Sequence, residues 1–166
     1  VLKNLEKHKS DSYVMWLDHA SFIIKLGNTT IITDPVFEKY YGYFGFGTKK
    51  YIEPPLELKE LPEINLFLLS HNHLDHMSQK TINNFPYKNT KVLVPLKLGK
   101  YFTRNGYKKD NVKEMDWFDK IKINDEITVT MLPAQHWSRR WIWGDGNTNR
   151  SLWGSFLIEY KDKKIF

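Results

Sequence analysis

Residues 66–78 read LFLLSHNHLDHMS, a short apolar run followed at once by three histidines and an aspartate. The run 66–69 is too short for a helix and is typical of a buried strand. In an extended chain, side chains two positions apart point to the same side, so His71 and His73 can reach one ion together. Asp75 and His76 follow where the chain turns, which suits a second ion beside the first. The stretch predicts a strand that ends in a metal site.

The histidine cluster also indicates a kind of chemistry. Two metal ions about 3.5–4 Å apart are a recurrent device for hydrolysing phosphate esters and amides. A lone histidine is usually structural, and we interpret His8 in that way. Neighbouring imidazoles beside a carboxylate have few roles other than binding metal. The cluster therefore predicts a metal-dependent hydrolase.

The composition limits the classes of protein to which the chain can belong. Its 166 residues suffice for one domain with a sizeable core. The absence of cysteine excludes disulfides, thiolate nucleophiles and cysteine-based zinc sites. Any metal must be held by His, Asp or Glu, which favours hydrolytic or oxidative zinc, manganese or iron. The net charge of +6 comes with scattered lysines, so nucleic-acid binding is not favoured, whereas attraction to phosphate-bearing substrates or anionic lipid is compatible.

The hydropathy pattern predicts the setting of the protein. No apolar run approaches the roughly 20 residues of a membrane-spanning helix. We expect no transmembrane segment, a cytoplasmic location and at most peripheral contact with a membrane. Residues 1–12 are a polar, Lys-rich lead-in at the surface, and residues 13–166 form one domain. The sequence does not define an oligomeric state.

Three strands are predicted before the cluster. They cover residues 13–17, 21–26 and 29–33, with Gly27 and Asn28 as a two-residue hairpin turn. The third strand runs into Asp34, whose carboxylate lies at a strand tip before Pro35. Asp34 could bind metal, but such a carboxylate more often accepts backbone N–H groups, and we interpret it as buttressing the histidine loop. His19, between two strands, is either structural or lines the site from beneath.

A long connection follows at residues 36–63, in which aromatic residues alternate with glycine around 40–47. Long loops without periodicity often act as lids or binding loops. Tyr43 and Phe44 are therefore candidates for an apolar wall near a substrate or a lipid surface. The alternative is that these rings simply pack over the sheet.

The segment after the cluster alternates helices with strands. Ser78 is predicted to cap a helix over 79–85, and a second helix is predicted over 95–105 with Gly106 after its end. Strands are predicted at 91–94, 112–115, 121–123 and 127–132, and a final hairpin at 152–160 and 164–166.

A further histidine, His136, lies just after the end of the predicted strand 127–132. Beside an existing pair, a third imidazole can complete the three-protein-ligand set that leaves a fourth position for water. Trp137 follows it directly. Asp145 is a possible carboxylate ligand, but Gly-Asp-Gly is first a turn signal.

Together these motifs resemble the metallo-β-lactamase superfamily. The resemblance is carried by Trp16-Leu17-Asp18-His19-Ala20-Ser21, Thr33-Asp34-Pro35, the H-x-H-x-D-H loop and the later strand-end histidine. Within the superfamily, Pro133-Ala134-Gln135-His136-Trp137 and Leu152-Trp153-Gly154-Ser155 are similar to the branch that contains N-acylphosphatidylethanolamine-hydrolysing phospholipase D. The resemblance to the superfamily implies an α/β (α+β layered) fold, the metallo-β-lactamase-like αββα sandwich. This chain would supply the first half of that sandwich and the start of the second.

The resemblance also implies a ligand set. His71, His73 and His136 would hold a first zinc, while Asp75 and His76 would serve a second; manganese or iron are alternatives to zinc. Asp75 would in addition be the catalytic residue that orients the attacking hydroxide. A bridging aspartate and a final histidine are expected beyond Phe166, which suggests a partly recorded polypeptide. Asp18 departs from the family, whose members carry glycine there.

The expected reaction is hydrolysis by a dinuclear-metal-activated water. Its substrate would be a small molecule or a lipid, with phosphodiesters such as N-acylphosphatidylethanolamine-like phospholipids favoured. Tyr43, Phe44 and Trp137 are the candidate walls for an apolar portion. A lactonase or other carboxylic-ester hydrolase is the alternative enzyme, and a non-catalytic metal- or nucleic-acid-binding module is the alternative of another class.

Overall fold

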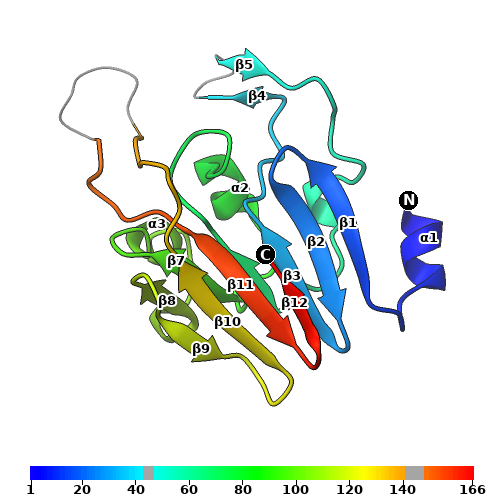
Figure 1. Cartoon of the computed structure of the whole chain (residues 1–166). Coiled ribbons are helices and arrows are strands. Elements are labelled where there is room, and N and C mark those ends of the chain that lie inside the picture. The colour runs from blue at the N-terminus through cyan, green and yellow to red at the C-terminus, as the bar shows by residue number, and fades with distance from the viewer. Residues whose placement is uncertain (43–46, 141–147) are drawn as a thin grey trace.

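The computed structural model describes residues 1–42, 47–140 and 148–166 as two packed sheets with helices on one outer face (Figure 1). The first half contains α1 (Leu2–Lys7), β1 (Tyr13–Asp18), β2 (Ser21–Leu26), β3 (Thr29–Thr33), β4 (Tyr40–Tyr41), β5 (Thr48–Lys49), the 3₁₀ turn η1 (Leu58–Glu60), β6 (Leu66–Leu68) and α2 (Gln79–Asn84). The second half contains β7 (Lys91–Pro95), α3 (Lys100–Thr103), η2 (Lys109–Asn111), β8 (Val112–Met115), β9 (Lys120–Lys122), β10 (Ile127–Leu132), β11 (Ser155–Tyr160) and β12 (Lys163–Ile165).

The larger sheet has the strand order β1-β2-β3-β6-β7-β8. Its first three strands are antiparallel, and the β2–β3 turn is made possible by Gly27, whose φ of 55° suits glycine. From β3 onward the strands are parallel. The carboxyl ends of β3 and β6 therefore lie at the same edge of the sheet, and both lead into polar segments there.

The smaller sheet, with the order β12-β11-β10-β9, packs against one face of the larger sheet (Figure 1). Strand β10 alternates as predicted, because Ile127, Val129 and Met131 are all buried between the sheets. This layer aligns the carboxyl end of β10 with the edge at which β3 and β6 end.

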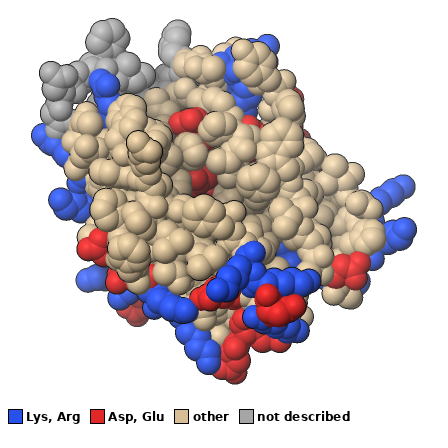
Figure 2. Space-filling view, in the orientation of Figure 1, with Lys and Arg blue, Asp and Glu red and all other residues tan. Residues whose placement is uncertain are grey.

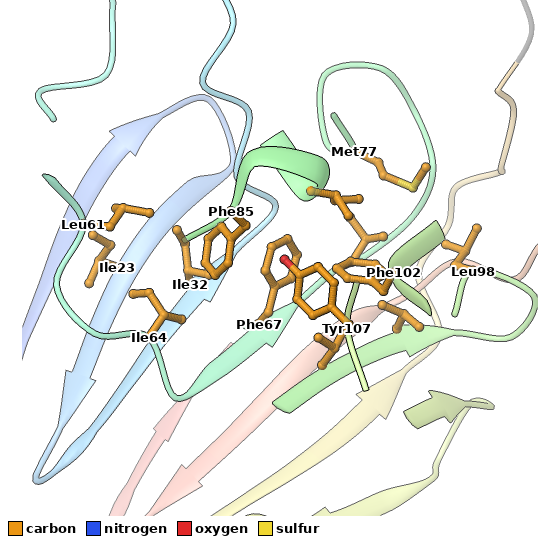
Figure 3. Packing of buried hydrophobic residues seen from close by; sticks show 14 of the residues in the cluster. Ile23, Ile32, Leu61, Ile64, Phe67, Met77, Phe85, Leu98, Phe102 and Tyr107 are labelled. Carbon is orange, nitrogen blue, oxygen red and sulfur yellow. The ribbon is translucent and has the colours of Figure 1, made fainter. Parts of the chain in front are cut away.

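The opposite face of the larger sheet is covered by α2, α3 and the 58–64 segment (Figure 3). Phe67 of β6 is the centre of this layer, with its ring 5.3 Å from that of Phe85 and 5.0 Å from that of Phe102, both edge-on. Such pairs add about 0.5–1.5 kcal/mol to the burial of their apolar area. The strand that leads to the histidines is thus fixed from both faces.

The predicted helix over 95–105 is wrong for most of its length. Pro95 instead ends β7, where it pairs with Met115 of β8, and only Lys100–Thr103 are helical. A proline fits a strand end because its missing N–H is not needed there. The lead-in also contains the short helix α1, and the 36–63 connection contains the paired strands β4 and β5.

The remaining expectations agree more closely with the structure. The helix after the cluster is α2, one residue shorter than predicted, and Ser78 caps it by accepting the Thr81 N–H at 3.0 Å. Over the part of the chain that the structure describes, no helix has both the length and the apolar character that a membrane crossing requires.

Charged side chains gather along one edge of the molecule, over the turns that join β9 to β10 and β11 to β12 (Figure 2). Lysines and acidic residues pair across these strands and turns, as in Lys120–Glu159, Lys122–Asp125 and Lys161–Glu126. Exposed pairs of this kind contribute little to stability. The positive charge on this face is therefore interleaved with negative charge.

Candidate metal centre

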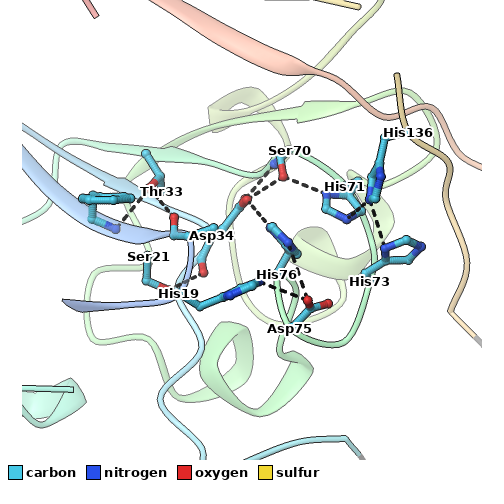
Figure 4. A network of polar contacts seen from close by, with 12 residues as sticks. His19, Ser21, Thr33, Asp34, Ser70, His71, His73, Asp75, His76 and His136 are labelled. Carbon is cyan, nitrogen blue, oxygen red and sulfur yellow. Dashed lines mark hydrogen bonds and ion pairs between the residues drawn. The ribbon is translucent and has the colours of Figure 1, made fainter. Parts of the chain in front are cut away.

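Three imidazoles converge where β6 and β10 end (Figure 4). Nε2 of His136 lies 3.0 Å from Nε2 of His71 and 3.2 Å from Nδ1 of His73. His71 and His73 leave the same strand two positions apart, whereas His136 comes from the other sheet. The structure thus brings together the three histidines that the sequence singled out for one ion.

The spacing of these nitrogens fits a single metal ion. Tetrahedral zinc with bonds of about 2.0–2.1 Å to imidazole would place its ligand nitrogens about 3.3–3.4 Å apart. The nitrogen of His73 that faces this position is Nδ1, whereas His71 and His136 present Nε2. These three side chains are therefore a candidate donor set for one metal ion.

The electrostatic surroundings keep two of these rings neutral. Burial, followed by the neighbouring histidines, lowers the pKa of His71 to about 2. Burial, followed by the proximity of His136, lowers the pKa of His73 to about 4. Neutral imidazole is the form that binds metal, so neither ring has to lose a proton near pH 7.

A second group of donors lies beside the first and consists of His19, Asp75 and His76. Oδ2 of Asp75 is 3.1 Å from Nε2 of His19 and 3.7 Å from Nε2 of His76. The rings of His71 and His76 are only 4.1 Å apart between centroids, so the two groups adjoin. This arrangement could hold a second ion next to the first.

Asp34 connects the two groups of donors (Figure 4). Its carboxylate accepts the Ser70 N–H at 2.7 Å, the Ser70 hydroxyl at 2.5 Å and Nδ1–H of His76 at 2.8 Å. The Ser70 hydroxyl in turn lies 2.8 Å from Nδ1 of His71. One buried carboxylate therefore orients an imidazole in each group.

The same carboxylate changes the protonation of His76. Burial acts to lower the pKa of His76, but the hydrogen bond and negative charge of Asp34, together with the charge of Asp75, outweigh it and raise the pKa. His76 therefore differs from His71 and His73, whose pKa values are lowered.

His19 has an unusual backbone conformation at the end of β1. Its φ is 43°, in the left-handed region that non-glycine residues rarely adopt, and Trp16 Nε1–H donates to its carbonyl oxygen at 3.0 Å. Strain of this kind persists where surrounding contacts fix it, often at functional sites. The conformation directs the His19 ring towards Asp75 (Figure 4).

Two supporting residues were missed by the sequence reasoning. Ser70 carries no signal of its own in the sequence, and its position between Asp34 and His71 follows from β3 and β6 being neighbours. Arg140 is buried and donates through one guanidinium nitrogen to the carbonyl oxygens of Asn72 (3.2 Å) and Met77 (2.5 Å). Arg140 thereby fixes the position of the loop that carries His73, Asp75 and His76. No local sequence signal indicates such a contact.

An open cleft with a volume of about 530 Å³ lies next to the donors. It is lined by His19, Tyr41, Thr48, His73, Leu74, Asp75, Trp137, Arg139 and Arg140. Trp137 is 43% exposed, and its ring lies 4.4 Å from that of His73. The wall candidates Tyr43 and Phe44, and the carboxylate of Asp145, lie outside the described residues.

Sequence comparison finds a matching protein family and similar curated proteins. A family described as "Beta-lactamase superfamily domain" matches residues 29–166. N-acyl-phosphatidylethanolamine-hydrolyzing phospholipase D, mitochondrial, of Saccharomyces cerevisiae is 32% identical over 164 residues, which cover 96% of this chain and 34% of that protein. The chain spans about a third to a half of the length of such curated relatives.

Solved structures resemble the chain in fold. A "possible metal-dependent hydrolase" from Veillonella parvula has a TM-score of 0.64 at 20% identity, over 92% of this chain and 60% of that one. CmlA, a diiron β-hydroxylase from Streptomyces venezuelae, has a TM-score of 0.63 at 25% identity, over 93% of this chain and 28% of that one. The layered α+β architecture and the resemblance on which it was predicted are confirmed.

Proposed function

The chain belongs to the β-lactamase superfamily domain family, and from this premise we propose that it forms the metal centre of a hydrolase acting on phosphodiesters such as N-acylphosphatidylethanolamine-like phospholipids. The observation that carries the proposal is the convergence of His71, His73 and His136, with Asp75 and His76 alongside. The first three side chains would hold one ion, and the last two would serve a second. We propose zinc for both positions.

The chain's own residues divide the catalytic work. A pair of metal ions supplies Lewis acidity and lowers the pKa of water towards neutrality. Asp75 faces the cleft, where its carboxylate accepts a hydrogen bond from the attacking water and orients it towards the substrate. Asp34 keeps His71 and His76 in their orientations. Cysteine is absent from these 166 residues, so none of them supplies a thiolate nucleophile.

The residues that line the cleft favour an anionic substrate with an apolar portion. Arg139 and Arg140 contribute positive charge, and Arg139 is close enough to His73 to act on its pKa. Tyr41, Leu74 and Trp137 provide apolar surface in the same cleft. A phosphodiester that carries a hydrocarbon chain matches both features. The similarity to a phospholipase D supports the same substrate class.

The proposal is tested by metal reconstitution. The protein is stripped with a chelator, reloaded with zinc, manganese or iron, and incubated with bis(p-nitrophenyl) phosphate and with a panel of lactones. We expect phosphodiester turnover that is lost on stripping and restored by metal. His71→Ala should abolish it, whereas the matched variant His8→Ala, which removes a histidine hydrogen-bonded to Asp11 at the surface, should retain it.

Two outcomes would overturn the assignment. Turnover of lactones without phosphodiester turnover would favour the carboxylic-ester alternative. Phosphodiester turnover that persists in the fully stripped protein would exclude the metal mechanism. Metal analysis of the purified protein also bears on the cofactor, because the similar CmlA structure is that of a diiron enzyme.

A further inference from the structure

A buried ion pair lies beside the cleft, between Asp18 at the end of β1 and Lys50 directly after β5. The side chains of Asp18 and Lys50 are only 6% and 1% exposed. The Lys50 ammonium also donates to the carbonyl oxygen of Val36 and lies 5.1 Å from the centre of the Tyr41 ring. The other carboxylate oxygen of Asp18 accepts the Tyr41 hydroxyl at 2.6 Å. Each of the two buried charges therefore faces an opposite charge within the protein.

The energetics of this pair indicate a role other than stability. Removing two charges from water is costly, and their mutual attraction often fails to recover that cost. Apolar residues of similar volume in place of the ion pair would stabilise the fold to at least the same extent. What the pair adds is a fixed geometry, because Asp18, Lys50 and Tyr41 can satisfy one another in few arrangements.

The geometry that is fixed concerns the β4–β5 ribbon, defined as Tyr40–Tyr41 and Thr48–Lys49. Among the residues that the structure describes, these strands form a separate two-stranded sheet with no ladder to either main sheet. An isolated two-stranded ribbon is marginally stable in water and needs an anchor. Lys50 follows the ribbon and Tyr41 belongs to it, so both anchor it to Asp18.

The ribbon in turn supplies part of the cleft. Tyr41 and Thr48 line it together with His19 and Asp75. The Tyr41 ring lies 5.5 Å from that of His19, whose Nε2 is 3.1 Å from Asp75. A shift of the ribbon would thus move a wall of the cleft that is adjacent to the metal donors.

We propose that Asp18 and Lys50 are positioning residues that determine substrate fit, by holding the β4–β5 ribbon as a wall of the cleft. The inference rests on the proposed function for its kinetic readout, but the position of the ribbon can be measured without it. A purely structural role would change the free energy of unfolding and leave both the ribbon and the Michaelis constant unchanged.

The test uses the double variant Asp18→Asn/Lys50→Met, which removes both charges and leaves no unpaired ion. Its matched control is Asp125→Asn/Lys122→Met, which removes an exposed ion pair at the β9–β10 turn. Amide hydrogen exchange is followed in residues 38–50 and, as an internal reference, in β6. Metal content is determined, and kcat and KM are measured with bis(p-nitrophenyl) phosphate and with a phosphodiester that carries a longer apolar group.

We expect faster exchange in 38–50 with unchanged exchange in β6 and unchanged metal content. KM for the longer substrate should rise about fivefold or more while kcat stays within about twofold, since an interaction made equally in the ground and transition states is lost. The control should behave as the wild type. Wild-type exchange in 38–50, or a loss of kcat together with loss of metal, would overturn the proposal.

Two further measurements decide the cases in which the wild type is inactive or the double variant does not fold. If no phosphodiester is hydrolysed even by the wild type, the proposed function fails, and hydrogen exchange alone decides whether the ion pair holds the ribbon. If the double variant does not fold, Tyr41→Phe takes its place, because it removes only the hydroxyl that Asp18 accepts. Unchanged exchange in Tyr41→Phe would then count against the proposal, and increased exchange would support it.

Discussion

The orientation of an imidazole in each group of donors depends on the buried carboxylate of Asp34. It accepts from Ser70 and His76 and, through Ser70, orients His71. Replacing Asp34 with Asn keeps the volume but removes the charge and one acceptor. We expect the affinity for metal to fall about 10–100-fold, the range found for partners that orient ligands. Competition against a chromophoric chelator measures the change.

Asp125→Asn is a suitable control for this variant, because Asp125 is exposed and lies in the β9–β10 turn. Its affinity for metal should equal that of the wild type. An Asp34→Asn protein that binds both ions with wild-type affinity would contradict the role assigned to Asp34.

The lowered pKa values of His71 and His73 predict how the metal-free protein responds to acid. In the unfolded chain both rings titrate near pH 6.5, whereas in the folded protein burial lowers their pKa values to about 2 and about 4. Between these limits the unfolded chain binds protons that the folded protein excludes, so the free energy of unfolding decreases as the pH falls below 6.5. Each excluded proton contributes about 1.4 kcal/mol per pH unit, and less for the more exposed His73.

Urea unfolding of the metal-free protein at pH 6.5, 5.5 and 4.5 measures this slope. In His71→Asn the slope should be smaller by roughly one proton, while His8→Asn should match the wild type. Equal slopes for His71→Asn and the wild type would show that His71 is protonated normally in the folded state.

At this scale the sequence indicates the candidate donors but not the residues that support them. His71, His73, Asp75 and His76 stand out in the sequence because they lie within six positions and follow a strand. For His19 the sequence does not decide between a structural role and a position in the site. Arg140 was missed because its partners are backbone carbonyl oxygens 63 and 68 positions away, and backbone groups leave no trace in a sequence.

Among the elements, the loop between β6 and α2 is held in part by a distant side chain, Arg140. Arg140→Met would remove the donor to the carbonyl oxygens of Asn72 and Met77 while retaining most of the apolar stem. We expect faster amide exchange in 71–78 and faster dissociation of metal. Arg104→Met, an exposed change after α3, should alter neither, and unchanged exchange in Arg140→Met would contradict the assignment.

The start of α2 depends on Ser78, whose hydroxyl accepts the Thr81 N–H. Ser78→Ala leaves that donor unpaired, so the free energy of unfolding should fall by about 1 kcal/mol. Urea unfolding measures it, with the exposed Ser10→Ala as a control expected to change by less than about 0.5 kcal/mol. Equal stability of Ser78→Ala and the wild type would mean that the cap contributes nothing.

Elements were predictable where residue composition and turn chemistry agreed. The strands β2 and β3 have the predicted bounds because Gly27 fixes the turn between two segments rich in β-branched residues. The helix over 95–105 failed because Pro95 has a φ that suits a helix start as well as a strand end. The pairing of β7 with β8, which no local pattern reveals, decided between the two.

At the scale of the whole molecule, the donors join the two sheets. His71 and His73 follow the larger sheet, and His136 follows the smaller one, so a shared ion would bind only the packed arrangement. Removal of metal by a chelator should therefore lower the midpoint of thermal unfolding. At free zinc 100 times the dissociation constant, the stabilisation is about 2.7 kcal/mol.

The thermal midpoint with and without chelator checks this, and His71→Ala provides the control, since it should show little difference between the two conditions. An unchanged wild-type midpoint would mean that the donors do not bind metal in the folded protein.

The distance in sequence between His73 and His136 has a consequence for biosynthesis. A polypeptide emerging from the ribosome exposes the first two imidazoles some sixty residues before the third, and domains take shape progressively during translation. Tight capture of an ion must therefore wait until β10 has left the exit tunnel and docked. Cellular metal supply would then act only after the two sheets have packed together, and scarcity would leave a compact apo species in place of a stalled nascent chain.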